Sequence, residues 1–142
     1  MHLDAILPIH PLKGDALDSL RAALLVHSLA LSGAEEALRS FIVVHPTGMG
    51  SLLRPLQMLS DKVRLVAESE VFSGPEMLRL KKRSGWRRQQ FIKLAAPRIS
   101  DAEFFLTLDA DNVSLRGFAV NQILQDGRIC SKRLLTAAAG AA

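Results

Sequence analysis

The sequence predicts an α/β fold in which a mostly parallel, Rossmann-like sheet is flanked by helices. Short apolar runs of strand length alternate with segments that repeat apolar residues at helical spacing. Strands that alternate with helices imply right-handed crossover connections and therefore a parallel sheet. With 142 residues, of which 49% are hydrophobic, the chain is long enough for one domain with a sizeable core.

The first half of the chain contains three predicted strands, at residues 3–9, 40–45 and 63–68. Pro8 indicates that the first strand stops there, because proline cannot donate a hydrogen bond to a neighbouring strand. Asp15 is a good N-cap for a helix whose apolar face continues to Ser32 and Gly33. A second helix is expected over residues 52–59, and residues 70–74 are expected to form a loop.

The second half begins with two predicted helices, over residues 75–82 and 86–96, the second of which Pro97 should end. Residues 104–108 are almost all apolar and predict a strand buried on both faces of the sheet. A short helix is expected over residues 120–125, followed by a turn at Asp126 and Gly127. The candidate strand at residues 128–131 is the one segment that would pair with the far side of the 104–108 strand.

Two carboxylates, Asp109 and Asp111, directly follow the predicted strand over residues 104–108. In an extended chain, alternate side chains point to the same side, so these two charges would lie close together and repel each other. Open α/β sheets bind ligands just outside the carboxyl ends of their strands. A hard divalent cation with a phosphate would relieve the repulsion at such a place. An ordinary solvated acidic turn is the alternative interpretation.

The net charge of +4 is unevenly distributed, since residues 76–142 hold twelve of the basic side chains and six of the acidic ones. The segment 79–93 has seven cations and no acid, which fits a nucleic acid, an anionic surface or a phosphate-bearing ligand. A single cysteine, Cys130, excludes a disulfide framework within the chain. We find no signal peptide and no apolar stretch long enough to cross a bilayer, so we expect a cytoplasmic protein.

Several polar side chains near the expected strand ends are candidate ligand contacts. A lysine or arginine on the helix before the 104–108 strand can reach a phosphate at the strand's end, and glutamine can bind a base or sugar hydroxyl. Ordinary surface or packing roles are the alternative for each of them. The candidates are Pro8, Ile9, His10, Glu68, Arg88, Gln89, Gln90 and Lys93.

Two motifs resemble the GT-A-fold glycosyltransferases that use nucleotide-diphosphate sugars. They are Gly85-Trp-x-x-Gln-Gln-x-x-Lys-Leu94 and Phe105-Leu-x-Leu-Asp-Ala-Asp-Asn-Val-x-Leu-Arg116. The pattern is most similar to an uncharacterised bacterial glycosyltransferase-like group with G-W-x-R-Q-Q-x-x-K-L before L-D-A-D. The resemblance is specific over residues 84–118 and only architectural over residues 1–75.

The resemblance implies a UDP- or GDP-sugar as donor and Mn²⁺ or Mg²⁺ as cofactor. Asp111 would bind the cation that bridges the diphosphate, and Asp109 would bind the cation, the ribose or both. Lys93 matches the helix lysine that approaches the diphosphate or donor sugar. Arg88, Gln89 and Gln90 match the R-Q-Q triplet of the group, without an implied role.

The resembling enzymes continue well beyond the acidic motif with an acceptor-binding half. We therefore expect residues 1–133 to be an incomplete, C-terminally truncated nucleotide-sugar transferase-like domain, and residues 134–142 to be a frayed tail. Such a domain would bind the donor without transferring sugar to its unknown acceptor, and it would tend to self-associate through an uncovered edge. The alternative function is a small basic α/β module that binds nucleic acid or an anionic surface. The basic segment lacks the interleaved aromatics expected for nucleic acid, which we consider the weaker interpretation.

Overall fold

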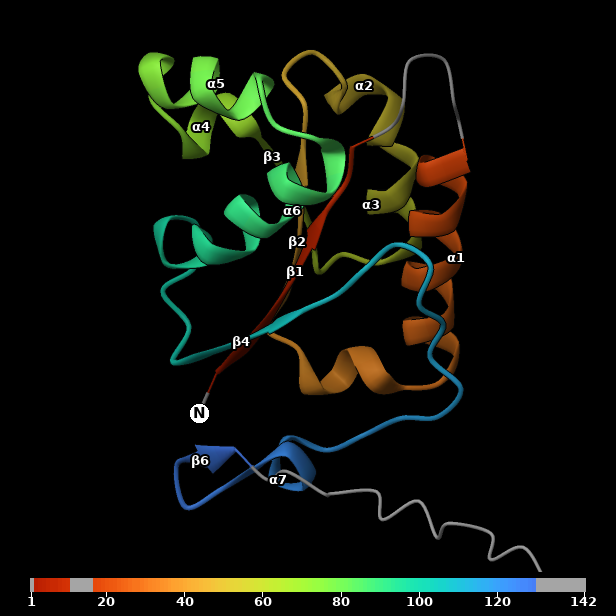
Figure 1. Ribbon diagram of the computed structural model, residues 1–142. Helices are drawn as coiled ribbons and strands as arrows, with labels where there is room; N and C mark the ends of the chain where they lie inside the picture. Colours follow the sequence, from red (N-terminus) through yellow and green to blue (C-terminus); the bar gives the residue numbers. More distant parts are fainter. Residues whose placement is uncertain (1, 11–16, 130–142) are drawn as a thin grey trace, which may run out of the picture.

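Four parallel strands form the central sheet of the protein (Figure 1). The computed structural model describes residues 2–10 and 17–129. The strand order across the sheet is β3-β2-β1-β4, which confirms the predicted Rossmann-like α/β class. The strands are β1 (Leu3–Pro8), β2 (Ser40–His45), β3 (Val63–Ala67) and β4 (Phe104–Thr107).

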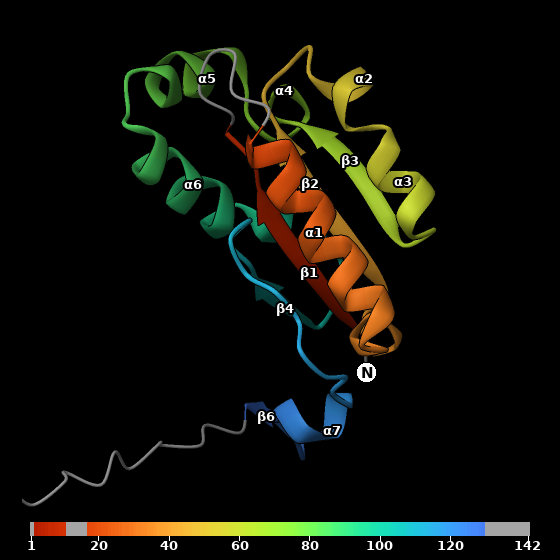
Figure 2. The same ribbon diagram turned by 90° about the vertical axis from the view of Figure 1, so that its right-hand side faces the viewer.

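Helices cover both faces of this sheet (Figure 2). One face carries α1 (Leu17–Leu31), α2 (Gly50–Leu53) and α3 (Pro55–Leu59), and the 3₁₀ turn η1 (Ala34–Ala37) follows α1. The other face carries α4 (Glu68–Val71), α6 (Gly85–Leu94) and the 3₁₀ turn η2 (Ala96–Arg98). Helix α5 (Gly74–Lys81) packs against α4 and α6. The predicted N-cap Asp15 lies outside the described residues.

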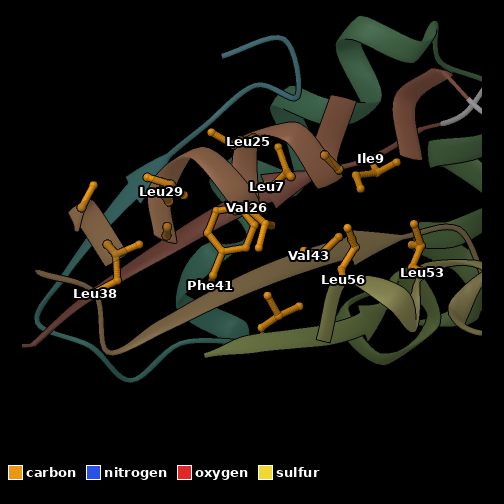
Figure 3. Packing of buried hydrophobic residues seen from close by; sticks show 14 of the residues in the cluster. Leu7, Ile9, Leu25, Val26, Leu29, Leu38, Phe41, Val43, Leu53 and Leu56 are labelled. Atoms are coloured by element: carbon orange, nitrogen blue, oxygen red, sulfur yellow. The ribbon is translucent and has the colours of Figure 1, made fainter. Parts of the chain in front are cut away.

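The larger core lies between the sheet and α1 (Figure 3). Strands β1 and β2 are buried at every position, because their almost uninterrupted apolar sequences suit strands covered on both faces. Leu25, Val26 and Leu29 of α1 pack over Leu7 and Val43. Burying each such side chain contributes about 1.5–3 kcal/mol, so this layer fixes the position of β1 and of the residues that follow it.

Strand β4 differs from its prediction as a strand buried on both faces. It pairs with β1 along one edge, and no other strand of the described chain pairs with it. Phe104 and Leu106 are half-buried on the α1 side, but Phe105 and Thr107 are exposed on the other face. The reason is that α6 packs over β1, which leaves the outer edge and one face of β4 uncovered.

Two other elements differ in detail from the sequence prediction. Glu70, expected in a loop, lies in α4, because its carboxylate accepts a hydrogen bond of 2.7 Å from the backbone N–H of Ala67 and caps the helix. The single helix expected over residues 52–59 is interrupted at Arg54, and Pro55, which has no backbone N–H, begins α3.

The described chain ends in a short hairpin that stands apart from the four-stranded sheet (Figures 1 and 2). It follows α7 (Val120–Ile123) and consists of β5 (Leu124–Gln125) and β6 (Arg128–Ile129). Asp126 and Gly127 form the predicted turn, and both have positive φ angles, of 49° and 72°. The strand predicted at 128–131 thus pairs with β5 and not with β4. Its last two residues and the predicted tail lie outside the described residues.

A buried acidic group, Asp4, fixes the amino-terminal end of the sheet. Arg39 Nε donates to Asp4 Oδ1 at 3.0 Å, and Ser100 Oγ donates to Asp4 Oδ2 at 2.6 Å. Burial by itself raises the pKa of Asp4, but hydrogen bonds from Arg39 and Ser100 outweigh burial and hold this pKa below its usual value. Arg39 also binds Asp101 at 2.6 Å, so the group ties β1 to the segment that leads into β4.

Candidate functional site

Several of the predicted site residues lie just beyond the carboxyl ends of the strands. Because all four strands are parallel, these ends lie at the same end of the sheet. His10 follows β1, Glu68 follows β3, and Asp109 follows β4. Lys93 comes to Asp109 from α6, a helix that packs against β1.

The contact between Lys93 and Asp109 joins the two sequence motifs. Lys93 Nζ lies 2.6 Å from Asp109 Oδ1, although sixteen positions separate the residues in the sequence. The lysine side chain is only 14% exposed, whereas that of Asp109 is 57% exposed. The ammonium group is therefore held in place by its covered stem, while the carboxylate still faces solvent.

Asp111 is exposed and forms no side-chain hydrogen bond or ion pair with other residues in the described part of the chain. The sequence argument placed Asp109 and Asp111 on the same side of an extended chain, and this is wrong in detail. Strand β4 ends at Thr107, and the segment then turns, with the N–H of Asn112 donating to the carbonyl of Asp109 at 3.1 Å. The carboxylate pair is thus presented by a turn.

The segment that follows this turn is fastened to α1, which the sequence analysis did not predict. The backbone N–H of Ser114 donates to Ser28 Oγ at 2.9 Å, and the hydroxyls of Ser114 and Ser32 lie 2.8 Å apart. Gly117 comes so close that a Cβ atom there would lie 2.6 Å from the carbonyl oxygen of Ser32. In the sequence, this contact could have been anticipated from Ser28 and Ser32, two polar residues four positions apart in an otherwise apolar helical segment.

Glu68 and Arg88 are both buried and bind each other. Arg88 Nε donates to Glu68 Oε1 at 2.8 Å, and a second guanidinium nitrogen contacts Glu68 Oε2. Glu68 is fully buried and Arg88 is 9% exposed. A ligand role for either side chain would require this bidentate pair to open, so the geometry gives them a structural role.

The residues at the end of β1 divide into core and edge positions. Pro8 and Ile9 have buried side chains, and the Ile9 N–H donates to the carbonyl of Val44 at 2.8 Å, so they belong to the core. His10 lies beside Gly85, and its buried Nδ1 has no hydrogen-bond partner among the described residues. Burial lowers the pKa of His10, and the charge of Arg88 lowers it further, against smaller opposing effects of Glu68 and Asp18. The imidazole is therefore neutral near pH 7.

Gln89 and Gln90 are half-buried on α6 and form no side-chain hydrogen bond within the described chain. Trp86 is 70% exposed at the start of α6 and does not belong to the core. The geometry thus brings together Lys93 with Asp109 and places Asp111 in the same turn. It does not bring Gln89 or Gln90 into contact with this group.

No helix among residues 2–10 and 17–129 has the length and apolarity to cross a membrane.

Comparison with known proteins gives one match. Neither a curated protein nor a solved structure matches the chain. A profile of a family of unknown function, DUF6492, matches residues 1–136. Because the match covers almost the whole sequence, the chain belongs to the DUF6492 family.

Proposed function

We propose that this protein is glycosyltransferase-like and binds a nucleotide-diphosphate sugar through a divalent cation beyond the carboxyl end of β4. The contact of 2.6 Å between Lys93 Nζ and Asp109 Oδ1 is the observation that carries the proposal. It joins the helix motif and the acidic motif of the sequence at the edge where open α/β sheets bind ligands. An ammonium group beside carboxylates is a combination that can hold both a cation and the phosphates the cation brings.

Asp109 and Asp111 would hold the cation, Mn²⁺ or Mg²⁺. Hard cations prefer carboxylate oxygens, and in phosphate sites Mg²⁺ takes one or two carboxylates, with water and phosphate oxygens as its other ligands. The described residues contain no group of three or more His, Cys, Asp and Glu side chains that could hold a metal ion. The pair therefore fits a cation that binds together with a diphosphate better than one held by the protein alone.

Lys93 would then change its partner on ligand binding. Its ammonium group neutralises Asp109 at a distance of 2.6 Å. A divalent cation on Asp109 would repel this ammonium group, which would turn to an oxygen of the diphosphate. The bound cation supplies charge neutralisation to the phosphates, and the largely covered stem of Lys93 limits where its charge can go.

The proposal is tested by calorimetric titration of UDP and GDP into the protein, with and without Mn²⁺. We expect measurable binding only with Mn²⁺, and a loss of at least about tenfold in affinity for Asp111→Ala. Asp61→Ala is the matched control, since it also removes one exposed carboxylate. Asp61 precedes β3 and therefore lies at the amino-terminal ends of the strands, away from the candidate site. Equal UDP affinity of wild type and Asp111→Ala in the presence of Mn²⁺ would contradict the proposal.

The alternative function, binding of nucleic acid or an anionic surface, is favoured by exposed cations at the end of α5 and in the turn before α6. Lys81, Lys82 and Arg83 are exposed and form no salt bridge with the described residues. We expect the triple change of these residues to alanine to weaken nucleotide binding far less than Lys93→Ala alone. A larger loss from the triple change, together with salt-sensitive binding of single-stranded DNA, would favour the alternative.

A further inference from the structure

A hollow of about 420 Å³ lies where α5 packs against α6. Helix α6 contributes Phe91 and Leu94 to its lining, whereas Lys93 and Asp109 do not line it. Both helices lie on the same side of the sheet (Figures 1 and 2). The hollow is therefore distinct from the candidate cation site, and the proposed function does not use it.

The floor of this hollow is apolar. Leu80 and Ala95 are buried beneath it, while Phe91 is 46% and Leu94 is 79% exposed. An aromatic ring and an aliphatic side chain thus line the same concave surface while in contact with water. Such a surface is favourable for a ligand that carries an apolar body, because covering it removes apolar area from water.

The wall of the hollow carries an excess of positive charge. Arg98 is compensated, since its Nη1 and Nη2 lie 3.1 Å and 3.0 Å from the two carboxylate oxygens of Glu76. Hydrogen bonds from Arg98 and Ser73 lower the pKa of Glu76 to about 2, so this carboxylate stays ionised near neutral pH. Arg79 and Arg83 also line the hollow, and neither forms a salt bridge with a described residue.

The position of Arg83 connects the charge to the apolar floor. Its guanidinium group lies 6.0 Å from the centroid of the Phe91 ring, which fits a weak cation–π contact. The guanidinium lies at the border of the apolar surface, and its N–H donors form no hydrogen bond with the described residues. A guanidinium group can donate two parallel hydrogen bonds to one phosphate. Arginine side chains therefore favour phosphate over an anion that accepts only one hydrogen bond.

We propose that this hollow is a binding site for an amphipathic phosphate ester. Arg79 and Arg83 bind the phosphate, and the apolar part of the ligand covers Phe91 and Leu94. Such a group is found both on free alkyl or aryl phosphates and in the headgroup region of phospholipids. The chemistry required is the same for both: a charged phosphate ester whose organic part carries an apolar chain or ring.

The test compares octyl phosphate with two partial ligands, inorganic phosphate and the uncharged octyl glucoside, by calorimetric titration. We expect octyl phosphate to bind at least about tenfold more tightly than either partial ligand. Arg79→Gln/Arg83→Gln should weaken its binding at least about tenfold, because both phosphate contacts are lost. Leu94→Ser, at an exposed position, should lower the affinity for octyl phosphate but leave the weak binding of inorganic phosphate unchanged.

The matched control is Lys81→Gln/Lys82→Gln. It also removes two positive charges from this stretch of the chain, but at exposed positions that do not line the hollow. It should leave octyl phosphate binding within about twofold of wild type. Asp111→Ala should leave it unchanged as well, so a failure of the proposed nucleotide site does not affect this result.

Co-sedimentation with phosphatidylcholine vesicles, with and without phosphatidic acid, distinguishes the two sources of the phosphate. Vesicle binding that requires phosphatidic acid and is lost with the arginine changes but not the lysine changes would assign a lipid headgroup. Binding of octyl phosphate without vesicle binding would assign a free ligand. Equal losses from both double changes, or equal affinity for inorganic phosphate and octyl phosphate, would overturn the proposal.

Discussion

Glu68 and Arg88 form a buried ion pair near the carboxyl ends of the strands. Glu68 is fully buried, and the bidentate contact with Arg88 satisfies both of its carboxylate oxygens. Removing one partner of such a pair leaves an uncompensated charge in the interior, whereas replacing both by apolar residues of similar size can be nearly neutral. The pair connects the start of α4 to α6, the helix that carries Lys93.

We predict that Glu68→Leu and Arg88→Met each lower the free energy of unfolding by about 3 kcal/mol, and that the double change loses less than either single one. Urea denaturation followed by circular dichroism measures this cycle. The exposed pair Glu76 and Arg98 is the control, for which the same cycle should show a much smaller coupling. Additive losses in the Glu68 and Arg88 cycle would contradict a coupled buried pair.

Sequence patterns predicted candidate site residues but not their partners. The acidic motif and the preceding lysine marked Asp109, Asp111 and Lys93 as neighbours of the sheet edge. Nothing in the one-dimensional pattern indicated that Glu68 and Arg88 would satisfy each other, because that pairing depends on how α4 and α6 pack. The burial of Pro8 and Ile9 also depends on tertiary packing, so the sequence pattern did not exclude them as ligand contacts.

At the scale of elements, local apolar patterns predicted β1, β2 and β3 well and the edge strand β4 less well. The limits of β2 agree with the prediction, and β1 and β3 each end one residue earlier than predicted. Strand β4 has an apolar sequence like the others, yet one of its faces is exposed. A run of apolar residues predicts a strand, but whether helices cover both of its faces depends on tertiary packing.

The segment after β4 presents Asp111. Ser28 of α1 and Ser32, which directly follows α1, hold this segment through contacts with Ser114 and Gly117. These contacts fix a turn that lacks regular secondary structure of its own. If the turn moved freely, the cost of ordering it would reduce cation binding. The contacts with α1 therefore support the proposed function by pre-organising the acidic pair.

We predict that Gly117→Ala weakens Mn²⁺-dependent UDP binding and lowers stability by about 1–3 kcal/mol, because the new Cβ atom would meet the carbonyl oxygen of Ser32 at 2.6 Å. Calorimetric titration and limited proteolysis measure the two effects. Gly74→Ala is the control, since a Cβ atom there meets nothing within 4 Å. Unchanged binding and stability in Gly117→Ala would show that α1 does not hold this segment.

For the molecule as a whole, the outer edge of β4 is one of two unpaired strand edges of the described sheet, the outer edge of β3 being the other. No strand in the described part of the chain pairs with this edge. Apolar side chains gather on β4 and the segment after it, with Phe105 41%, Val113 59% and Leu115 91% exposed. Unpaired strand edges beside exposed apolar groups favour pairing with another chain.

We predict that the 142-residue chain self-associates through β4 in a concentration-dependent way, which multi-angle light scattering measures. Thr107→Lys should shift the population toward monomer, because a charge on an exposed edge strand opposes strand pairing with a second copy. Thr47→Lys, an exposed position in the loop after β2, adds the same charge elsewhere and should leave association unchanged. If the wild-type chain is monomeric at all concentrations, the edge is not an association surface. If both lysine variants dissociate equally, net charge controls association, and pairing at β4 does not.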